Sequence, residues 1–252
     1  MSRATSLITS YLQAFIFGLL ALRCILAWLR ERDNRSGHLA AAAGLFALSS
    51  LMGALTTTFI DQTKLEVVPR WEQVASSIVL FVSIYFFLVF LSDFVRFPRW
   101  VHGLVIVITL IAIAFSFIER PDLKLNLKTF QLEKITGVDN PISYKVYIGY
   151  VLLYLAVAFG VLAVAFLVYG FRSDGLARFR MISIGSGFLV FCIVIGLLPR
   201  ILFGDPSATT VKTLLNILTY VALAVGPLLL VGFAPPKFIR DRFPESSARL
   251  GA

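Results

Sequence analysis

Charged residues are scarce in this chain of 252 residues. They make up only 15% of it, whereas ordinary soluble domains carry about 25%. Hydrophobic residues reach 58% and the mean hydropathy is +0.87. A water-soluble core cannot bury that much apolar surface. We therefore expect an integral membrane protein, and its length leaves room for one helical bundle but not for a second, soluble domain.

Cysteine and histidine are equally rare, with two residues of each. Cys24 and Cys192 both fall inside apolar stretches, which argues against a disulfide framework. His38 and His102 stand at the starts of apolar stretches, whereas a b-type haem needs facing pairs of ligands within the membrane. The sequence therefore predicts no cofactor and no metal site.

Several function classes lack their required residues. A retinal protein needs a lysine in the middle of its last helix, and the apolar stretch 213–233 has none. Small sugar transporters use helices broken at matching positions of two halves, but only Pro227 lies well inside an apolar stretch here. Intramembrane hydrolases and lipid transferases need a buried Ser/His pair, a carboxylate cluster or a buried histidine. We find no such set and expect no catalytic residues, so the chain is predicted not to be an enzyme.

What the chain has in abundance is long apolar runs separated by charges and turn residues. Continuous apolar runs indicate helices, because a spanning strand belongs to a closed barrel and alternates apolar with polar residues. The prediction is an all-α fold of seven transmembrane helices, over residues 7–28, 39–60, 74–91, 101–118, 147–171, 181–198 and 213–233.

Basic residues gather in alternate connections, and cytoplasmic connections are the ones that carry an excess of Lys and Arg. Topology therefore explains the net charge of +9 better than nucleic-acid binding does. We expect an outside N-terminus and a cytoplasmic C-terminus, although the outer connection 119–145 is also basic. The predicted inner residues are Arg30, Arg32, Arg35, Arg96, Arg99, Arg172, Arg178, Arg180, Lys237, Arg240, Arg242 and Arg249.

The chain then divides into a membrane domain, 1–236, and a short basic cytoplasmic tail, 237–252. In the outer connection 119–145, Leu123, Leu125 and Leu127 alternate with polar residues, which favours a short hairpin or cap.

Tyrosines recur at helical spacing in the fifth span. Tyr147, Tyr150 and Tyr154 share one stripe, and Asn216 marks the same half of the seventh span. These four are the predicted ligand-binding residues, facing a common cavity. An interfacial aromatic belt, packing and interhelical hydrogen bonding produce the same pattern, so both interpretations stay open.

Two charges within or beside the spans have local explanations. Arg23 lies near the cytoplasmic end of the first span, where a long side chain can reach the headgroups. Asp93 ends the third span three residues before Arg96, a spacing that favours an interfacial ion pair.

The end of the seventh span carries a recognisable sequence. Residues 228–245 read Leu-Leu-Leu-Val-Gly-Phe-Ala-Pro-Pro-Lys-Phe-Ile-Arg-Asp-Arg-Phe-Pro-Glu. This resembles the exit from the N-terminal seven-helix region of bacterial membrane histidine kinases and related signalling proteins. The resemblance implies that the helices receive a signal and pass it to a cytoplasmic output domain. No phospho-acceptor helix, nucleotide-binding domain or cyclase domain follows in this sequence, so the chain would act through a partner, or be a remnant or a fragment.

The leading hypothesis is a non-enzymatic sensory or scaffolding module of the bacterial inner membrane that binds a small ligand or a partner. The predicted partners are the lipid bilayer and a cytoplasmic kinase or other signalling protein, with a homodimer left open. Coupling would run through the tail residues Lys237, Phe238, Arg240 and Arg242 at the membrane interface. The alternative is a small permease or transporter subunit, which would move solute by itself in proteoliposomes.

Overall fold

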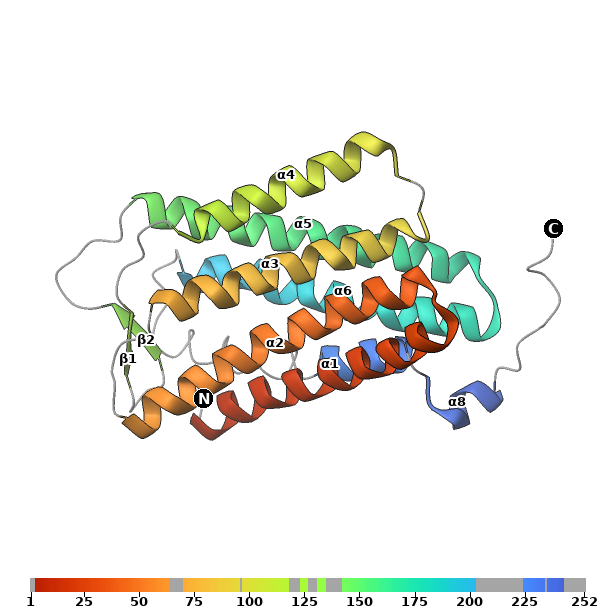
Figure 1. The fold of residues 1–252 in the computed structure, drawn as a ribbon, viewed down its shortest axis with the longest axis horizontal. Helices are drawn as coiled ribbons and strands as arrows, with labels where there is room; N and C mark the ends of the chain where they lie inside the picture. Colours follow the sequence, from red (N-terminus) through yellow and green to blue (C-terminus); the bar gives the residue numbers. More distant parts are fainter. Residues whose placement is uncertain are drawn as a thin grey trace.

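The computed structural model is a bundle of long helices (Figure 1). It describes residues 3–63, 70–95, 97–117, 123–126, 131–134, 142–202, 224–233 and 235–242. Its elements are α1 (Arg3–Glu31), α2 (Asn34–Thr63), α3 (Arg70–Ser92), α4 (Arg99–Phe115), β1 (Leu123–Asn126), β2 (Gln131–Lys134), α5 (Ile142–Arg172), α6 (Gly175–Leu202) and α8 (Lys237–Arg242), with a further short helix over Ala224–Phe233.

Five helical stretches are long and apolar enough to cross a membrane, which indicates a multi-pass membrane protein. They are Tyr11–Glu31, Asn34–Thr56, Val74–Ser92, Gly149–Arg172 and Gly175–Gly196. Two shorter apolar helices, α4 and Ala224–Phe233, fall where the fourth and seventh spans are expected. Residues 203–223 lie outside the described residues, so the count of seven crossings stays a prediction.

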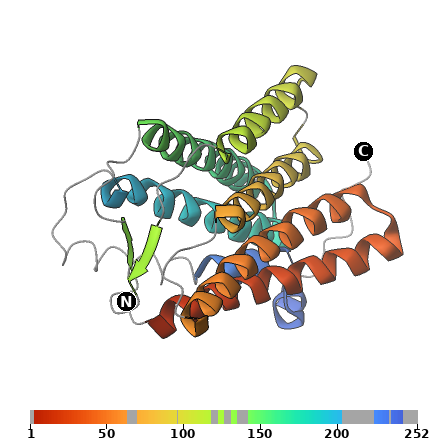
Figure 2. The ribbon, with the colours of Figure 1, turned by 60° about the vertical axis from the view of Figure 1, so that its left-hand side comes forward.

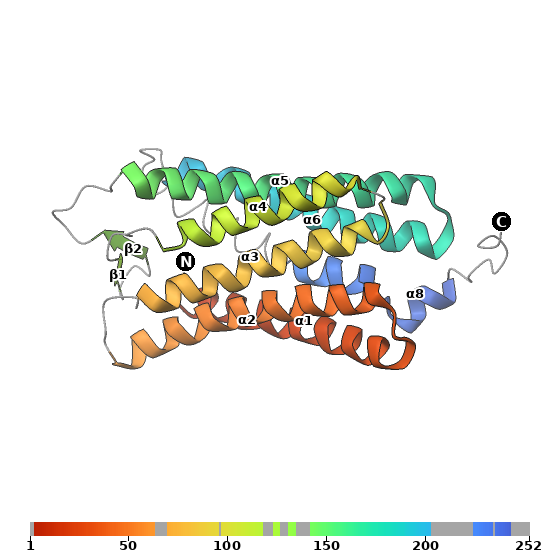
Figure 3. The ribbon, with the colours of Figure 1, turned by 45° about the horizontal axis from the view of Figure 1, so that its top comes forward.

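The tight turn between α1 and α2 follows from its own residues. Arg32 adopts a left-handed backbone conformation, with φ of 54°, and its N–H donates to the Trp28 carbonyl at 2.7 Å. Asp33 then caps α2, because its carboxylate accepts the backbone N–H groups of Arg35 and Ser36 at 3.3 and 3.4 Å. The chain therefore reverses within a few residues and lays α2 beside α1 (Figure 3).

Aromatic rings fill the centre of the bundle. Phe188 of α6 stacks on Phe159 and Phe166 of α5, with ring centroids 5.9 and 6.1 Å apart, and meets Phe87 of α3 edge-on. Small residues set the helix spacing, since a Cβ on Gly185 would lie 2.9 Å from the Leu167 backbone nitrogen of α5. The core therefore combines large rings with close backbone contacts.

All connections that the sequence places on the inner side meet at one end of the bundle (Figure 1). We call it the basic end: it holds the turn between α1 and α2, the turn between α5 and α6, and α8. The opposite end holds the antiparallel pair β1 and β2, which pairs Leu125 with Leu132 and confirms the predicted hairpin. Which end faces the cytoplasm stays a prediction.

Candidate functional site

The tyrosine stripe of α5 faces α4. The Tyr150 hydroxyl donates to the Ile108 carbonyl at 2.7 Å, and the Tyr154 hydroxyl lies 3.0 Å from Thr109 Oγ1. The Thr109 hydroxyl donates its single proton to the Val105 carbonyl at 2.8 Å, so Tyr154 is the donor in its hydrogen bond to Thr109. Two tyrosine hydroxyls thus fasten α5 to α4.

Beside these hydrogen bonds lies a cavity of about 460 Å³, which we call the tyrosine cavity. The half of α4 that begins at Arg99 diverges from α5 (Figure 2). Residues of this half of α4, of α3 and of α5 line the cavity. Its lining is almost wholly apolar and consists of Tyr85, Leu88, Val89, Phe97, Val101, His102, Leu104, Val105, Ile108, Tyr150, Leu153, Tyr154, Val157, Ala158 and Val161.

The tyrosine cavity opens sideways, toward the surroundings of the bundle. Leu104, Leu153 and Val157 in its wall are 47%, 64% and 56% exposed. In a bilayer those surroundings are hydrocarbon, so an apolar molecule dissolved in the membrane can reach the cavity without crossing water.

Two of the four predicted ligand-binding residues line the tyrosine cavity. Tyr150 and Tyr154 line the tyrosine cavity, whereas Tyr147 is buried and is not part of its wall. Tyr154 is also a packing residue, because it is 7% exposed and its ring meets Phe81 edge-on at 5.7 Å. Asn216 lies outside the described residues. The grouping of the tyrosines with Asn216 therefore stays a prediction.

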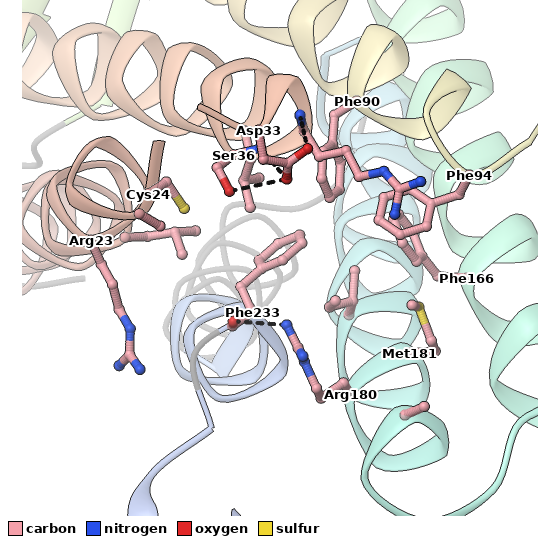
Figure 4. A pocket seen from close by; sticks show the side chains of 16 residues that line it. Arg23, Cys24, Asp33, Ser36, Phe90, Phe94, Phe166, Arg180, Met181 and Phe233 are labelled. Atoms are coloured by element: carbon pink, nitrogen blue, oxygen red, sulfur yellow. Dashed lines mark hydrogen bonds between the residues drawn. The ribbon is translucent and has the colours of Figure 1, made fainter. Parts of the chain in front are cut away.

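A second cavity, of about 380 Å³, lies at the basic end, and we call it the basic-end cavity (Figure 4). Side chains from α1, α2, α3, α5, α6 and the helix Ala224–Phe233 surround it, together with the turn between α1 and α2. They are Leu20, Arg23, Cys24, Ala27, Asp33, Arg35, Ser36, Leu39, Phe90, Phe94, Phe166, Ala177, Arg180, Met181, Ile184 and Phe233.

Arg180 joins α6 to the last apolar helix. Its Nε donates to the Gly232 carbonyl at 3.2 Å, and its Nη2 donates to the Phe233 carbonyl at 3.4 Å. Carbonyls at a helix C-terminus have no partner within the helix and carry partial negative charge, so a guanidinium stabilises them. From the sequence, Arg180 was expected only to mark the inner side of the membrane. The signal for this contact was Pro235, which follows the helix and cannot supply the missing N–H donors.

The two other charges singled out in the sequence also lie at this end. His38 Nδ1 lies 2.9 Å from a carboxylate oxygen of Asp93. This contact joins the residue that follows α3 to α2. The predicted partner of Asp93, Arg96, lies outside the described residues. Arg23 is exposed and its guanidinium points away from Asp33 (Figure 4), which is the geometry expected of an arginine that extends to the headgroups.

The start of the predicted tail forms the short helix α8, which follows Pro235 and Pro236. Its predicted interface residues are all exposed, and Phe238 is 66% exposed. They are Lys237, Phe238, Arg240 and Arg242. Three basic side chains and one aromatic ring are therefore available to the headgroup region or to a partner.

Among the described residues, no three or more His, Cys, Asp or Glu side chains lie together in a group that could hold a metal ion. Comparison with known proteins adds no identity: no family model matches the chain, and neither a curated protein nor a solved structure matches it. The likeness of residues 228–245 to the histidine-kinase input region therefore stays a hypothesis.

Proposed function

We propose that this protein is a non-enzymatic sensory or scaffolding module of the bacterial inner membrane. It binds a small apolar or amphipathic molecule in the tyrosine cavity and acts on a cytoplasmic signalling partner through the basic end. The resemblance of its final helix to the input regions of membrane histidine kinases supports the signalling part of this proposal.

The tyrosine cavity is the observation that carries the proposal. Its volume of about 460 Å³ is within the range of small-molecule sites, which is about 300–1,000 Å³. Because the hydroxyls of Tyr150 and Tyr154 are engaged with α4, the cavity presents apolar side chains and ring faces. Such a lining favours a ligand that partitions into hydrocarbon, and the sideways opening supplies its route.

A ligand in this cavity would contact three helices at once. The cavity wall includes Val101 and Ile108 of α4, Tyr85 of α3 and Val157 of α5. A ligand shifts a conformational equilibrium only by its difference in affinity for the two states. We propose that the two states differ in how closely α4 lies against α3 and α5. Asp93 directly follows α3, and its contact with His38 reaches α2.

The packed centre of the bundle favours binding over transport. Phe81, Phe87, Phe166 and Phe188 are at most 1% exposed, so their rings are fully packed between the helices. This applies to the described residues. A transporter would still move solute when reconstituted alone, whereas a sensory module would only bind.

Filling the tyrosine cavity tests the binding function. Val157→Trp places an indole in the cavity from a position that is 56% exposed, so folding should be retained. Val164→Trp is the matched control, because Val164 is on the same helix, is 63% exposed and is not in the wall. We expect organic extracts of the purified wild type and of Val164→Trp to contain one apolar compound at near one-to-one stoichiometry, identified by mass spectrometry, and extracts of Val157→Trp to lack it. Equal content in all three proteins would refute the site.

Coupling to a partner has its own readout. A chain ending at Lys237 should still insert and fold, but crosslinking in cells should no longer recover the cytoplasmic partner found with the full chain. Recovery of the same partner without residues 238–252 would move the contact to the turns of the basic end, at Arg30–Arg35 and Arg172–Arg180 in sequence.

A further inference from the structure

The basic-end cavity has a polar rim and an apolar interior. Three arginines reach it from separate helices, Arg23 from α1, Arg35 from α2 and Arg180 from α6, and Asp33 is its one acidic residue. Phe90, Phe94, Phe166 and Phe233 form much of its interior. The lining thus carries an excess of positive charge at the level where the bundle ends.

Asp33 does not neutralise this charge by an ion pair. One of its carboxylate oxygens accepts the Arg35 N–H, and the other accepts the N–H and the hydroxyl of Ser36 at 3.4 Å. That carboxylate is committed to the N-terminus of α2, whose partial positive charge it offsets. Asp93, which contacts His38 at 2.9 Å, is not part of this cavity wall.

The two rim arginines are placed for a ligand at the surface of the bundle. Arg35 is exposed and lies over the Phe94 ring, with Cζ 5.2 Å from the ring centroid, which orients its guanidinium above the aromatic interior. Arg23 is exposed on the α1 side of the same cavity. Their planar guanidinium groups match carboxylate and phosphate oxygens.

We propose that the basic-end cavity is a second binding site, for an anionic membrane amphiphile. The phosphate or carboxylate lies at the guanidinium of Arg35, and Arg23 adds positive charge on the α1 side of the rim. The first part of one alkyl chain lies against Phe90, Phe94 and Phe166. A phosphoglycerol lipid and a free fatty acid share this chemistry. The site is distinct from the tyrosine cavity, because the two cavities have no lining residue in common.

Lipid titration of the full-length, delipidated protein in a non-ionic detergent tests the site, with bound adducts counted by native mass spectrometry. The probes are dioleoyl phosphatidylglycerol, oleate, dioleoyl phosphatidylcholine and inorganic phosphate. We expect phosphatidylglycerol or oleate to bind more tightly than phosphatidylcholine and phosphate. The tighter of the two identifies the source of the anionic group. The Arg23→Gln, Arg35→Gln double variant should weaken that binding roughly 30-fold, from about 1 kcal/mol for each basic residue.

The Arg172→Gln, Arg178→Gln double variant is the charge-matched control. It removes two exposed arginines of the same end that are not in the cavity wall, so binding should change by no more than about twofold. Ala177→Trp, an exposed position in the wall, should abolish binding by occupying the interior. Val157→Trp should leave it unchanged, which separates this site from the tyrosine cavity. Equal weakening by both arginine pairs, equal binding of phosphatidylcholine, or equal binding of phosphate alone would overturn the proposal.

Discussion

At the scale of single residues, several polar side chains of this bundle hydrogen-bond to the backbone of neighbouring helices. Ser83 donates to the Ala42 carbonyl at 2.7 Å, Tyr150 to the Ile108 carbonyl and Arg180 to the Gly232 carbonyl. Hydrocarbon offers no competing water, so a polar side chain within a span must find its partner in the protein. A polar residue in such a sequence therefore first indicates a link between helices.

Tyr154→Phe tests this interpretation because it removes one hydroxyl and keeps the ring packed against Phe81. Thr109 retains its bond to the Val105 carbonyl, so no buried group loses its only partner. We expect a loss of about 0.6–1 kcal/mol in the free energy of unfolding, the usual value of an interhelical hydrogen bond. Thermal unfolding in detergent measures it.

Tyr85→Phe is the control for that variant. Tyr85 lines the same cavity, and its hydroxyl makes no recorded hydrogen bond with the described residues. Its removal should leave the melting temperature unchanged. Equal melting temperatures for Tyr154→Phe and Tyr85→Phe would show that the bond between α4 and α5 contributes nothing.

At the scale of elements, the helix Ala224–Phe233 is defined by its close approach to α6. A Cβ on Gly232 would lie 2.6 Å from Ile184 Cγ1 and 3.1 Å from the Arg180 carbonyl oxygen, and one on Gly187 would lie 2.8 Å from Leu229 Cδ2. The two backbones can meet only because glycine stands at the crossing. Arg180 adds hydrogen bonds to the same contact, because it donates to the carbonyls of Gly232 and Phe233 at the end of the helix that precedes α8.

Gly232→Ala should therefore separate the last apolar helix from α6. We expect destabilisation of about 1–3 kcal/mol, the cost of overpacking a tight contact, despite the higher helix propensity of alanine. Gly149→Ala on α5 is the control, since nothing lies within 4 Å of a Cβ there and the same propensity gain applies. Thermal unfolding in detergent compares them, and a Gly232→Ala protein as stable as Gly149→Ala would contradict the close crossing.

At the scale of the whole molecule, the sequence predicted what depends on apolar length and on the placement of charge. Five long spans, the hairpin near Leu123 and the common end of the basic connections follow from these features. The pairing of His38 with Asp93 and the contact of Arg180 with Phe233 could not be predicted, because each joins residues more than fifty positions apart. Periodicity reports the face of one helix and not the partner that covers it.

The tyrosine cavity also combines a feature that the sequence predicted with one that it could not predict. Helical spacing placed Tyr150 and Tyr154 on one face of α5, which the structure confirms. That α4 would be the helix in front of them, and that it would diverge from α5, depends on three-dimensional packing that one sequence does not encode in any local pattern. Arg23 and Asp33 likewise line one cavity only because the turn after α1 reverses the chain.

The signalling part of the proposed function depends on the predicted orientation of the bundle, because a cytoplasmic partner can reach the basic end only if that end is inside. Trp71, at the start of α3, and Phe238, in α8, mark the two ends and are 71% and 66% exposed. The direct test introduces Trp71→Cys or Phe238→Cys into a chain with Cys24→Ala and Cys192→Ala, and treats intact cells with a membrane-impermeant maleimide. The account predicts that the cysteine at position 71 is labelled at once and the one at position 238 only after the cells are permeabilised. Labelling of position 238 in intact cells, with position 71 protected, would contradict it.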